Sequence, residues 1–483
     1  MRGRMTMALG VLACALLGAC GMEKDDSSNP EQISRVDSAL SATTNASGTA
    51  ESFHLTGTID RSNPFFLALG ANPRTCETCH AASQGWTLSA RAVSQLFAES
   101  GGLAPLFLPH DTGSSPTADL STEAARRAAF GPTLLRRGLI RFPRTLPATA
   151  EFTVTEVFDP AGFATPAQIT NFRRPTPTAN EAKVANILWA SGPGDVATAV
   201  AGVVGGAARF HEQRPDAVPV DQVNAARDFQ LGLFFAQTVD NDAGPLDADG
   251  ATGGPSNLAT QPFHVGINDI QGLDPAGQPF TRKVFDLFDA WSLEAQRHPH
   301  HDGDGCDESG FSDATQAHGD HRDRRTAARA AIHRGQELFN RKEFDITGVH
   351  GINDLLGQTT VRGTCSTCHN TPNVGGHSVF RMFDVGTADA PNCGPELPLL
   401  TLQNKTTGAT RQVCDMGRGG TGVWADVGSF RAPPLRGLAS RAPYFHDGQA
   451  KDIAQVIAYF NARFDIRLDR HQRRDLEAFL RAL

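Results

Sequence analysis

Residues 74–80 read RTCETCH, and residues 362–369 read RGTCSTCH. Each stretch contains Cys-x-x-Cys-His, the signature for covalent attachment of c-type haem. Two thiols at this spacing on one helical turn can reach both vinyl groups of a porphyrin, and the following His can ligate the iron. The sequence therefore predicts two covalently bound haem c groups, attached through Cys76, Cys79, Cys365 and Cys368, with His80 and His369 as proximal iron ligands.

A single Cys-x-x-Cys pair is also typical of a redox disulfide or of half a zinc site. Here the motif occurs twice, is followed by His both times and is preceded by Thr both times, which favours haem. The two copies lie far apart in the chain, so each haem is expected in its own domain. We therefore predict a mainly α fold made of two cytochrome c-like haem domains with little β structure.

The length of 483 residues suits two domains, and 40% hydrophobic with 20% charged residues is typical of globular proteins. We expect an N-terminal haem domain over residues 51–296 and a C-terminal one over 326–483. Apolar spacing predicts helices over 220–238, 283–296, 325–340 and 468–483, and alternation predicts a short strand over 152–155. The net charge of -8 gives no indication of a nucleic-acid partner.

The first 20 residues have two arginines and then a short apolar run, the pattern of a secretion signal. Leu17-Gly18-Ala19-Cys20 resembles a lipobox, which predicts a lipid anchor on Cys20 and a location in the periplasm or at the outer membrane. Signal cleavage without acylation is the alternative. Residues 21–50 are polar and lack periodicity, so we expect a flexible tether, and the only membrane contact expected is the anchor.

Residues 297–325 form a polar His- and Asp-rich insertion or linker around Cys306. Its imidazoles could bind a transition metal, although a hydrated surface loop has the same composition. Further along the chain, Cys393 and Cys414 flank a segment after the second motif. In an exported protein a disulfide between them is the simplest expectation, with two unpaired thiols as the alternative.

Residues 428–448, GSFRAPPLRGLASRAPYFHDG, resemble the C-terminal haem domain of the bacterial di-haem cytochrome c peroxidase and MauG superfamily. Residues 69–74 (LGANPR), residues 173–177 (RRPTP) and Trp189 extend the resemblance in the same order over most of residues 55–483. The resemblance implies that peroxide reacts at one haem while the other passes electrons. It also implies that Trp189 couples the two haems, whereas an ordinary buried aromatic is the alternative.

The sequence departs from this family at the position of the catalytic acid and base. Where the peroxidases have Trp-Asp-Gly-Arg and then a Gln and a Glu, this chain has WASG at 189–192 and DVATAVAG at 195–202. Peroxide cleavage needs a group that takes a proton from one oxygen and returns it to the other. The nearest substitutes are His211 and Glu212, with His211 as a candidate distal base. A surface or propionate-bound His211 is the competing interpretation.

The second axial ligand of the C-terminal haem also departs from the family. The peroxidases supply Met, and MauG supplies Tyr, about fourteen residues after the His that corresponds to His446. That count falls on Phe460, which cannot ligate iron, so the neighbouring Tyr459 is the predicted ligand. Met382, His377 or an open position are the alternatives.

Two further family features are changed. The distal His that caps the N-terminal haem in resting peroxidases falls near Leu96, so this haem is expected to be five-coordinate or water-capped unless His110 or His211 reaches it. The interhaem calcium site of the family draws on an Asn that here is Pro175, and on carbonyls near Arg441. Calcium therefore lacks one of its usual ligands in this chain.

Three functions agree with these features. The first is a di-haem oxidoreductase that uses peroxide or oxygen and takes electrons from a small redox protein or a quinol-linked donor. The second is an electron-transfer cytochrome without peroxidase activity, and the third is a haem-based sensor. A homodimer is compatible with each of them.

Overall fold

The computed structural model describes residues 42–292 and 315–483. The predicted signal peptide, the lipobox, Cys306 and most of the tether lie outside these residues. The tether was predicted to reach residue 50, but β1 (Ala42–Asn45) and β2 (Gly48–His54) already pair there as an antiparallel hairpin. The folded chain therefore begins earlier than the sequence indicated.

Four antiparallel sheets run through the described residues. The largest has the strand order β1-β2-β6-β7, the next has the order β11-β10-β4, and β3–β5 and β8–β9 form two-stranded ribbons. Their bounds are β3 Ile140–Arg144, β4 Phe152–Phe158, β5 Ile169–Arg173, β6 Leu233–Asp240, β7 Gly244–Pro245, β8 Phe344–Thr347, β9 Thr360–Gly363, β10 Leu399–Asn404 and β11 Thr410–Val413. The predicted strand at 152–155 is thus confirmed as part of β4.

The prediction of a mainly α protein with little β structure is wrong, because four sheets are present. The clearest error concerns residues 220–238, which we predicted as one helix. There α5 ends at Leu231, and Gly232 separates it from β6. The first five residues of β6 are all buried, and a short continuous apolar run suits a buried strand as well as a helix. Periodicity alone could not separate the two.

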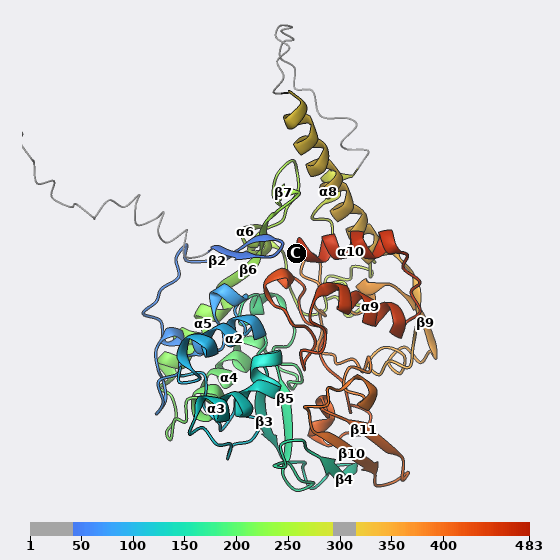
Figure 1. The fold of residues 1–483 in the computed structure, drawn as a ribbon. Helices are drawn as coiled ribbons and strands as arrows, with labels where there is room; N and C mark the ends of the chain where they lie inside the picture. Colours follow the sequence, from blue (N-terminus) through green and yellow to red (C-terminus); the bar gives the residue numbers. More distant parts are fainter. Residues whose placement is uncertain (1–41, 293–314) are drawn as a thin grey trace, which may run out of the picture. The chain divides into compact units, whose positions relative to one another are not determined.

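Eight α-helices are found in the described residues. They are α2 Ala90–Ser100, α3 Glu123–Phe130, α4 Val196–Phe210, α5 Val220–Leu231, α6 Pro255–Thr260, α8 Thr315–Arg341, α9 Ile453–Arg463 and α10 Arg470–Arg481. Asp469 caps α10, as predicted, by accepting from the backbone N–H of His471 and Gln472. The helices predicted over 325–340 and 468–483 are confirmed, although α8 already begins within the predicted polar insertion. In Figure 1, α10 lies against α8.

The helix predicted over 283–296 is not formed in its described part, which holds only a 3-10 turn at Asp289–Trp291. Side chains of α8 provide the reason. Asn340 Oδ1 accepts from the N–H groups of Val284 and Phe285, both at 3.1 Å, and Gln336 Oε1 accepts from Phe288 at 3.0 Å. These bonds satisfy backbone donors that a helix would otherwise pair internally.

The two halves of the chain are joined by strand pairing. β4 comes from the N-terminal half and pairs with β10, which lies between Cys393 and Cys414 (Figure 1). The predicted disulfide between these cysteines is present, with their Cα atoms 6.0 Å apart. Ser41–Leu483 cluster as one compact unit, and the division into two haem domains stays a prediction. None of the helices in the described part of the chain is long and apolar enough to cross a bilayer.

Candidate functional site

The two Cys-x-x-Cys-His motifs have the same local backbone. Single 3-10 turns carry Cys76–Thr78 and Cys365–Thr367. In the first turn the hydroxyl of Thr78 accepts from the backbone N–H of Thr75 at 3.0 Å. In the second turn the hydroxyl of Thr367 accepts from the N–H of Thr364, also at 3.0 Å. The repeated Thr in the sequence is thereby explained, because it holds each turn closed.

The histidines of both motifs are oriented through Nδ1. His80 Nδ1 bonds the carbonyl of Trp86 at 3.1 Å, and His369 Nδ1 bonds the carbonyl of Gly375. A bond at Nδ1 fixes the tautomer in which Nε2 has a free lone pair, as in metal-ligating histidines. Burial lowers the pKa of His80 to about 4 and also lowers the pKa of His369. Both imidazoles are therefore neutral at pH 7, the form that binds a metal.

The four motif cysteines are free of disulfide bonds. Burial raises the pKa of each of these thiols to about 12, so they are protonated at neutral pH: Cys76, Cys79, Cys365 and Cys368. Partly buried, unpaired thiols next in sequence to an oriented imidazole fit the attachment of a c-type haem at both motifs. In the described residues no cluster of three or more His, Cys, Asp or Glu side chains could hold a metal ion by itself.

A cavity of about 240 Å³ lies beside the second motif. Cys365, Cys368 and His369 line it, together with Trp189 and His446. Most of the other lining side chains are apolar, among them Phe339, Phe383, Phe430, Leu435, Ile457 and Phe460. A flat apolar group such as a porphyrin suits this lining.

Tyr459, the predicted second ligand, is not among the residues that line this cavity. Its hydroxyl donates to the carbonyl of Val385 at 2.9 Å, whereas the neighbouring Phe460 faces the cavity. His377 is bonded through Nδ1 to the carbonyl of Cys368 at 2.8 Å, and it does not line the cavity either. His446 does line it, and its buried Nε2 makes no hydrogen bond.

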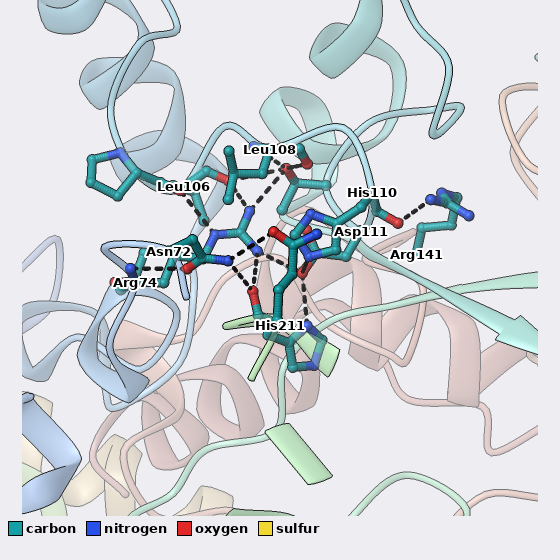
Figure 2. Close-up of polar contacts among 12 residues, drawn as sticks. Asn72, Arg74, Leu106, Leu108, His110, Asp111, Arg141 and His211 are labelled. Carbon is teal, nitrogen blue, oxygen red and sulfur yellow. Dashed lines mark hydrogen bonds and ion pairs between the residues drawn. The ribbon is translucent and has the colours of Figure 1, made fainter. Parts of the chain in front are cut away.

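A buried carboxylate lies near the first motif. Asp111 is 1% exposed, and Figure 2 shows Arg74 and His211 converging on its Oδ2, at 2.6 Å from Arg74 Nη1 and 2.8 Å from His211 Nδ1. His110 Nε2 lies 3.4 Å from the same oxygen. Burial opposes ionisation of Asp111, but the bonds from His211 and Arg74 hold its pKa below the ordinary value. Asp111 is therefore an anion that orients His211.

This network is tied directly to the first motif. Arg74, two residues before Cys76, also donates to the carbonyls of Pro105 and Leu106 at 2.9 and 2.6 Å. His211, at the end of α4, is tied to the same segment, because its backbone carbonyl accepts from Arg74 Nη1 at 3.3 Å. His211, the candidate distal base, therefore lies near the motif that is predicted to bind the N-terminal haem.

Glu212 is also close, but its carboxylate is already bonded. Glu212 is only 3% exposed, and its Oε2 accepts from the N–H of Leu69 at 2.6 Å. Its backbone carbonyl accepts from Ala71 at 2.8 Å. A Cβ at Gly70 would lie 2.1 Å from that carbonyl, so this close approach requires glycine. Glu212 therefore positions the loop that leads into the first motif.

Trp189 lies at a junction between the two motifs. Its indole Nε1 donates to the carbonyl of Arg174 at 2.8 Å, and the N–H of Arg174 donates to the carbonyl of His446 at 2.7 Å. The guanidinium of Arg174 donates to the carbonyl of Leu88. Leu88 lies two residues after Trp86, whose carbonyl bonds His80. A continuous chain of bonds therefore runs from the first motif to the cavity of the second.

Sequence reasoning missed Asp111, and it noted Arg74 and Arg174 only as parts of family-like stretches, without a role for either side chain. A weak signal was present, because His110-Asp111 follows an apolar stretch, LAPLFLP at 103–109, in which polar side chains stand out. The partners of these side chains are distant in the chain, since Arg74 bonds Asp111 and Arg174 bonds Leu88, and a single sequence does not reveal such contacts.

Comparison with known proteins gives partial matches. The chain is 35% identical over 120 residues to a cytochrome c551 peroxidase of Pseudomonas aeruginosa, covering 25% of this chain and 30% of that protein. It is 29% identical over 140 residues to cytochrome-c peroxidase IdrP1 of Denitromonas iodatirespirans, covering 25% of this chain and 36% of that protein. The chain thus spans about a third of the length of these relatives. No family model matches it.

Proposed function

We propose that this protein is an exported di-haem c-type cytochrome in which peroxide or oxygen reacts at the N-terminal motif and electrons pass through the C-terminal motif. The partial similarity to cytochrome c peroxidases supports a peroxidase-type cytochrome. The observation that carries the proposal is the His211–Asp111 pair, which Arg74 ties to the first motif, since it supplies an oriented imidazole where the family's usual Gln and Glu are absent.

The acid–base chemistry follows from this pair. A haem bound at Cys76, Cys79 and His80 would supply the electrons and the coordination position for peroxide reduction. Asp111 bonds Nδ1 of His211 and leaves Nε2 as the group that can accept a proton from one peroxide oxygen and return it to the other. Asp111 orients His211 as the carboxylate orients the histidine in a catalytic triad, and Arg74 in turn holds Asp111 in place.

The second candidate function is electron transfer without peroxidase activity. It is favoured by the absence of the family's Gln and Glu from residues 195–202. In both cases the expected donor is a small redox protein or a quinol-linked donor.

One experiment separates the two functions. The mature protein is expected to have two haem additions by mass spectrometry and to oxidise a reduced small cytochrome c when hydrogen peroxide is added. A protein with two haems that exchanges electrons with the cytochrome but does not consume peroxide would be an electron carrier. A protein with fewer than two haems would contradict both functions.

A further inference from the structure

Three buried arginines line the cavity of the second motif. Arg174, Arg431 and Arg441 are 6%, 5% and 6% exposed. They come from the segments at 173–177 and 428–448 that the sequence analysis singled out. Among residues 42–292 and 315–483, no Asp or Glu lines the same cavity. This wall is therefore positively charged and lacks a counter-charge from the protein.

The hydrogen-bond partners of these side chains are backbone carbonyls. Arg174 donates to Leu88 at 2.5 Å, Arg431 to Asn186 at 2.7 Å, and Arg441 to Gly437 and Pro434 at 3.2 and 2.9 Å. Within the described residues none of the three arginines forms an ion pair. The buried Nε atoms of Arg174 and Arg431 have no hydrogen-bond partner in the part of the chain that the structure describes. Donors that point at no acceptor therefore remain in this wall.

Neighbouring charges do not neutralise the arginines. Burial lowers the pKa of Arg174 to about 9 and that of Arg431 and Arg441 to about 10, and repulsion by Arg441 contributes at the other two. All three still carry their charge at pH 7. Glu181 is the carboxyl that acts on Arg431, but burial raises its pKa to about 8, so at pH 7 it is mostly protonated. Tyr444, with a pKa raised to about 12 by burial, is neutral as well.

Buried charges without a partner are costly, and proteins pair them or use them to bind a ligand of opposite charge. We propose that Arg174, Arg431 and Arg441 form a carboxylate-binding site in the cavity wall that holds the carboxylate groups of the haem at the second motif. Guanidinium groups bind carboxylates through paired, charge-assisted hydrogen bonds. The assignment rests on the proposed function, because it requires haem at this motif.

The same three charges argue against calcium in this wall. The family's site uses carbonyls near Arg441 and an Asn that is here Pro175, another residue of the cavity lining. A divalent cation would be repelled by the neighbouring guanidinium groups, so these residues do not fit calcium. In this chain the positive charge beside the second haem is supplied by arginine.

The test uses the full-length holoprotein with Arg174→Gln and Arg441→Gln combined. Haem is counted first by mass spectrometry, and the C-terminal haem is then titrated spectroelectrochemically. Removing nearby cations disfavours the reduced haem, so at a fixed potential its ratio of reduced to oxidised form should fall about tenfold or more. Arg436→Gln is the matched control, since Arg436 is 1% exposed, donates to three backbone carbonyls and does not line the cavity.

A double variant that retains both haems and titrates like the wild type would overturn the proposal, as would an Arg436→Gln variant with an equal shift. If the double variant does not fold, a crystal structure of the wild-type holoprotein decides. Guanidinium groups within hydrogen-bond distance of the haem carboxylates are expected, and carboxylates turned into solvent would contradict the site. A wild-type protein without haem at the second motif would instead refute the proposed function.

Discussion

The regions around His80 and His369 have the same motif and the same backbone turn, yet their surroundings differ. Cys76 and Cys79 pack against two separate hydrophobic clusters, whereas Cys365 and Cys368 pack against a single one. The first motif adjoins an anionic carboxylate bonded to an imidazole, and the second adjoins an apolar cavity with three cations. The two motifs therefore share their local geometry, while long-range packing gives them different surroundings.

The difference in polarity between the two sites favours different chemistry at each of them. Acid–base chemistry needs a group that can carry a proton near the reacting atoms, and His211 with Asp111 provides one near the first motif. Among the residues that line the second cavity, the cationic arginines are suited to hold carboxylates rather than to exchange protons. The His211–Asp111 pair therefore supports the proposal that peroxide reacts at the first site and that electrons pass through the second.

The largest expected effect is loss of one haem with retention of the other. Replacing Cys365 and Cys368 by Ala should remove one haem mass from the mature protein, and replacing Cys76 and Cys79 by Ala should remove the other. The thioether bonds cannot form without these thiols. If either double variant retains two covalent haems, attachment at that motif is refuted.

The next largest effect should be a loss of activity that is confined to the first site. His211→Ala should lower kcat/KM for peroxide by about 10²–10⁴-fold, the range for loss of a general acid–base group. The haem count and the spectrum of the C-terminal haem should not change.

A matched control is His264→Ala, because His264 also bonds a carboxylate, with Nε2 2.9 Å from Asp274 Oδ1. It should retain wild-type kcat/KM. Equal losses in both variants would mean that His211 has no special role.

Removing the disulfide should lower the stability of the protein without changing the chemistry of either site. Cys393→Ser with Cys414→Ser should lower the free energy of unfolding by about 2–4 kcal/mol, because the disulfide closes a loop that contains β10 and β11. Denaturant titration measures this change. Peroxide turnover below the unfolding transition should stay close to the wild type, and its complete loss would show that this loop belongs to the reactive site.

The smallest effect concerns the link between the sites. Trp189→Phe removes the indole N–H that donates to Arg174 while retaining most of the packing. Electron transfer between the haems, followed by rapid reduction, should slow about tenfold, which corresponds to about 1.4 kcal/mol of activation free energy. An unchanged rate would leave Trp189 as an ordinary buried aromatic.

Local features of the fold were predictable from the sequence. The α10 cap at Asp469, the helix over 325–340, the strand at 152–155 and the Cys393–Cys414 disulfide follow from short-range patterns. The described part of the predicted helix, residues 283–292, and β6 were mispredicted because their conformation depends on distant partners. β6 pairs with β2, and the amides near Val284 and Phe288 bond side chains of α8.

The candidate site was predictable to a similar degree. His211 could be chosen as the nearest substitute in sequence for the family's Gln and Glu, but its partner Asp111 is 100 residues away in the chain. The three cavity arginines lie in stretches that the sequence analysis noted, yet only the structure shows that they share one cavity without a carboxylate. Tyr459 was chosen by counting residues, and the structure places its hydroxyl on Val385.

The most direct test of the difference between the two sites is the electron paramagnetic resonance spectrum of the resting wild-type protein, recorded with and without cyanide. We predict a high-spin ferric signal from the N-terminal haem that becomes low-spin on adding cyanide, while the signal of the C-terminal haem does not change. Two low-spin haems that both fail to respond to cyanide would contradict the account.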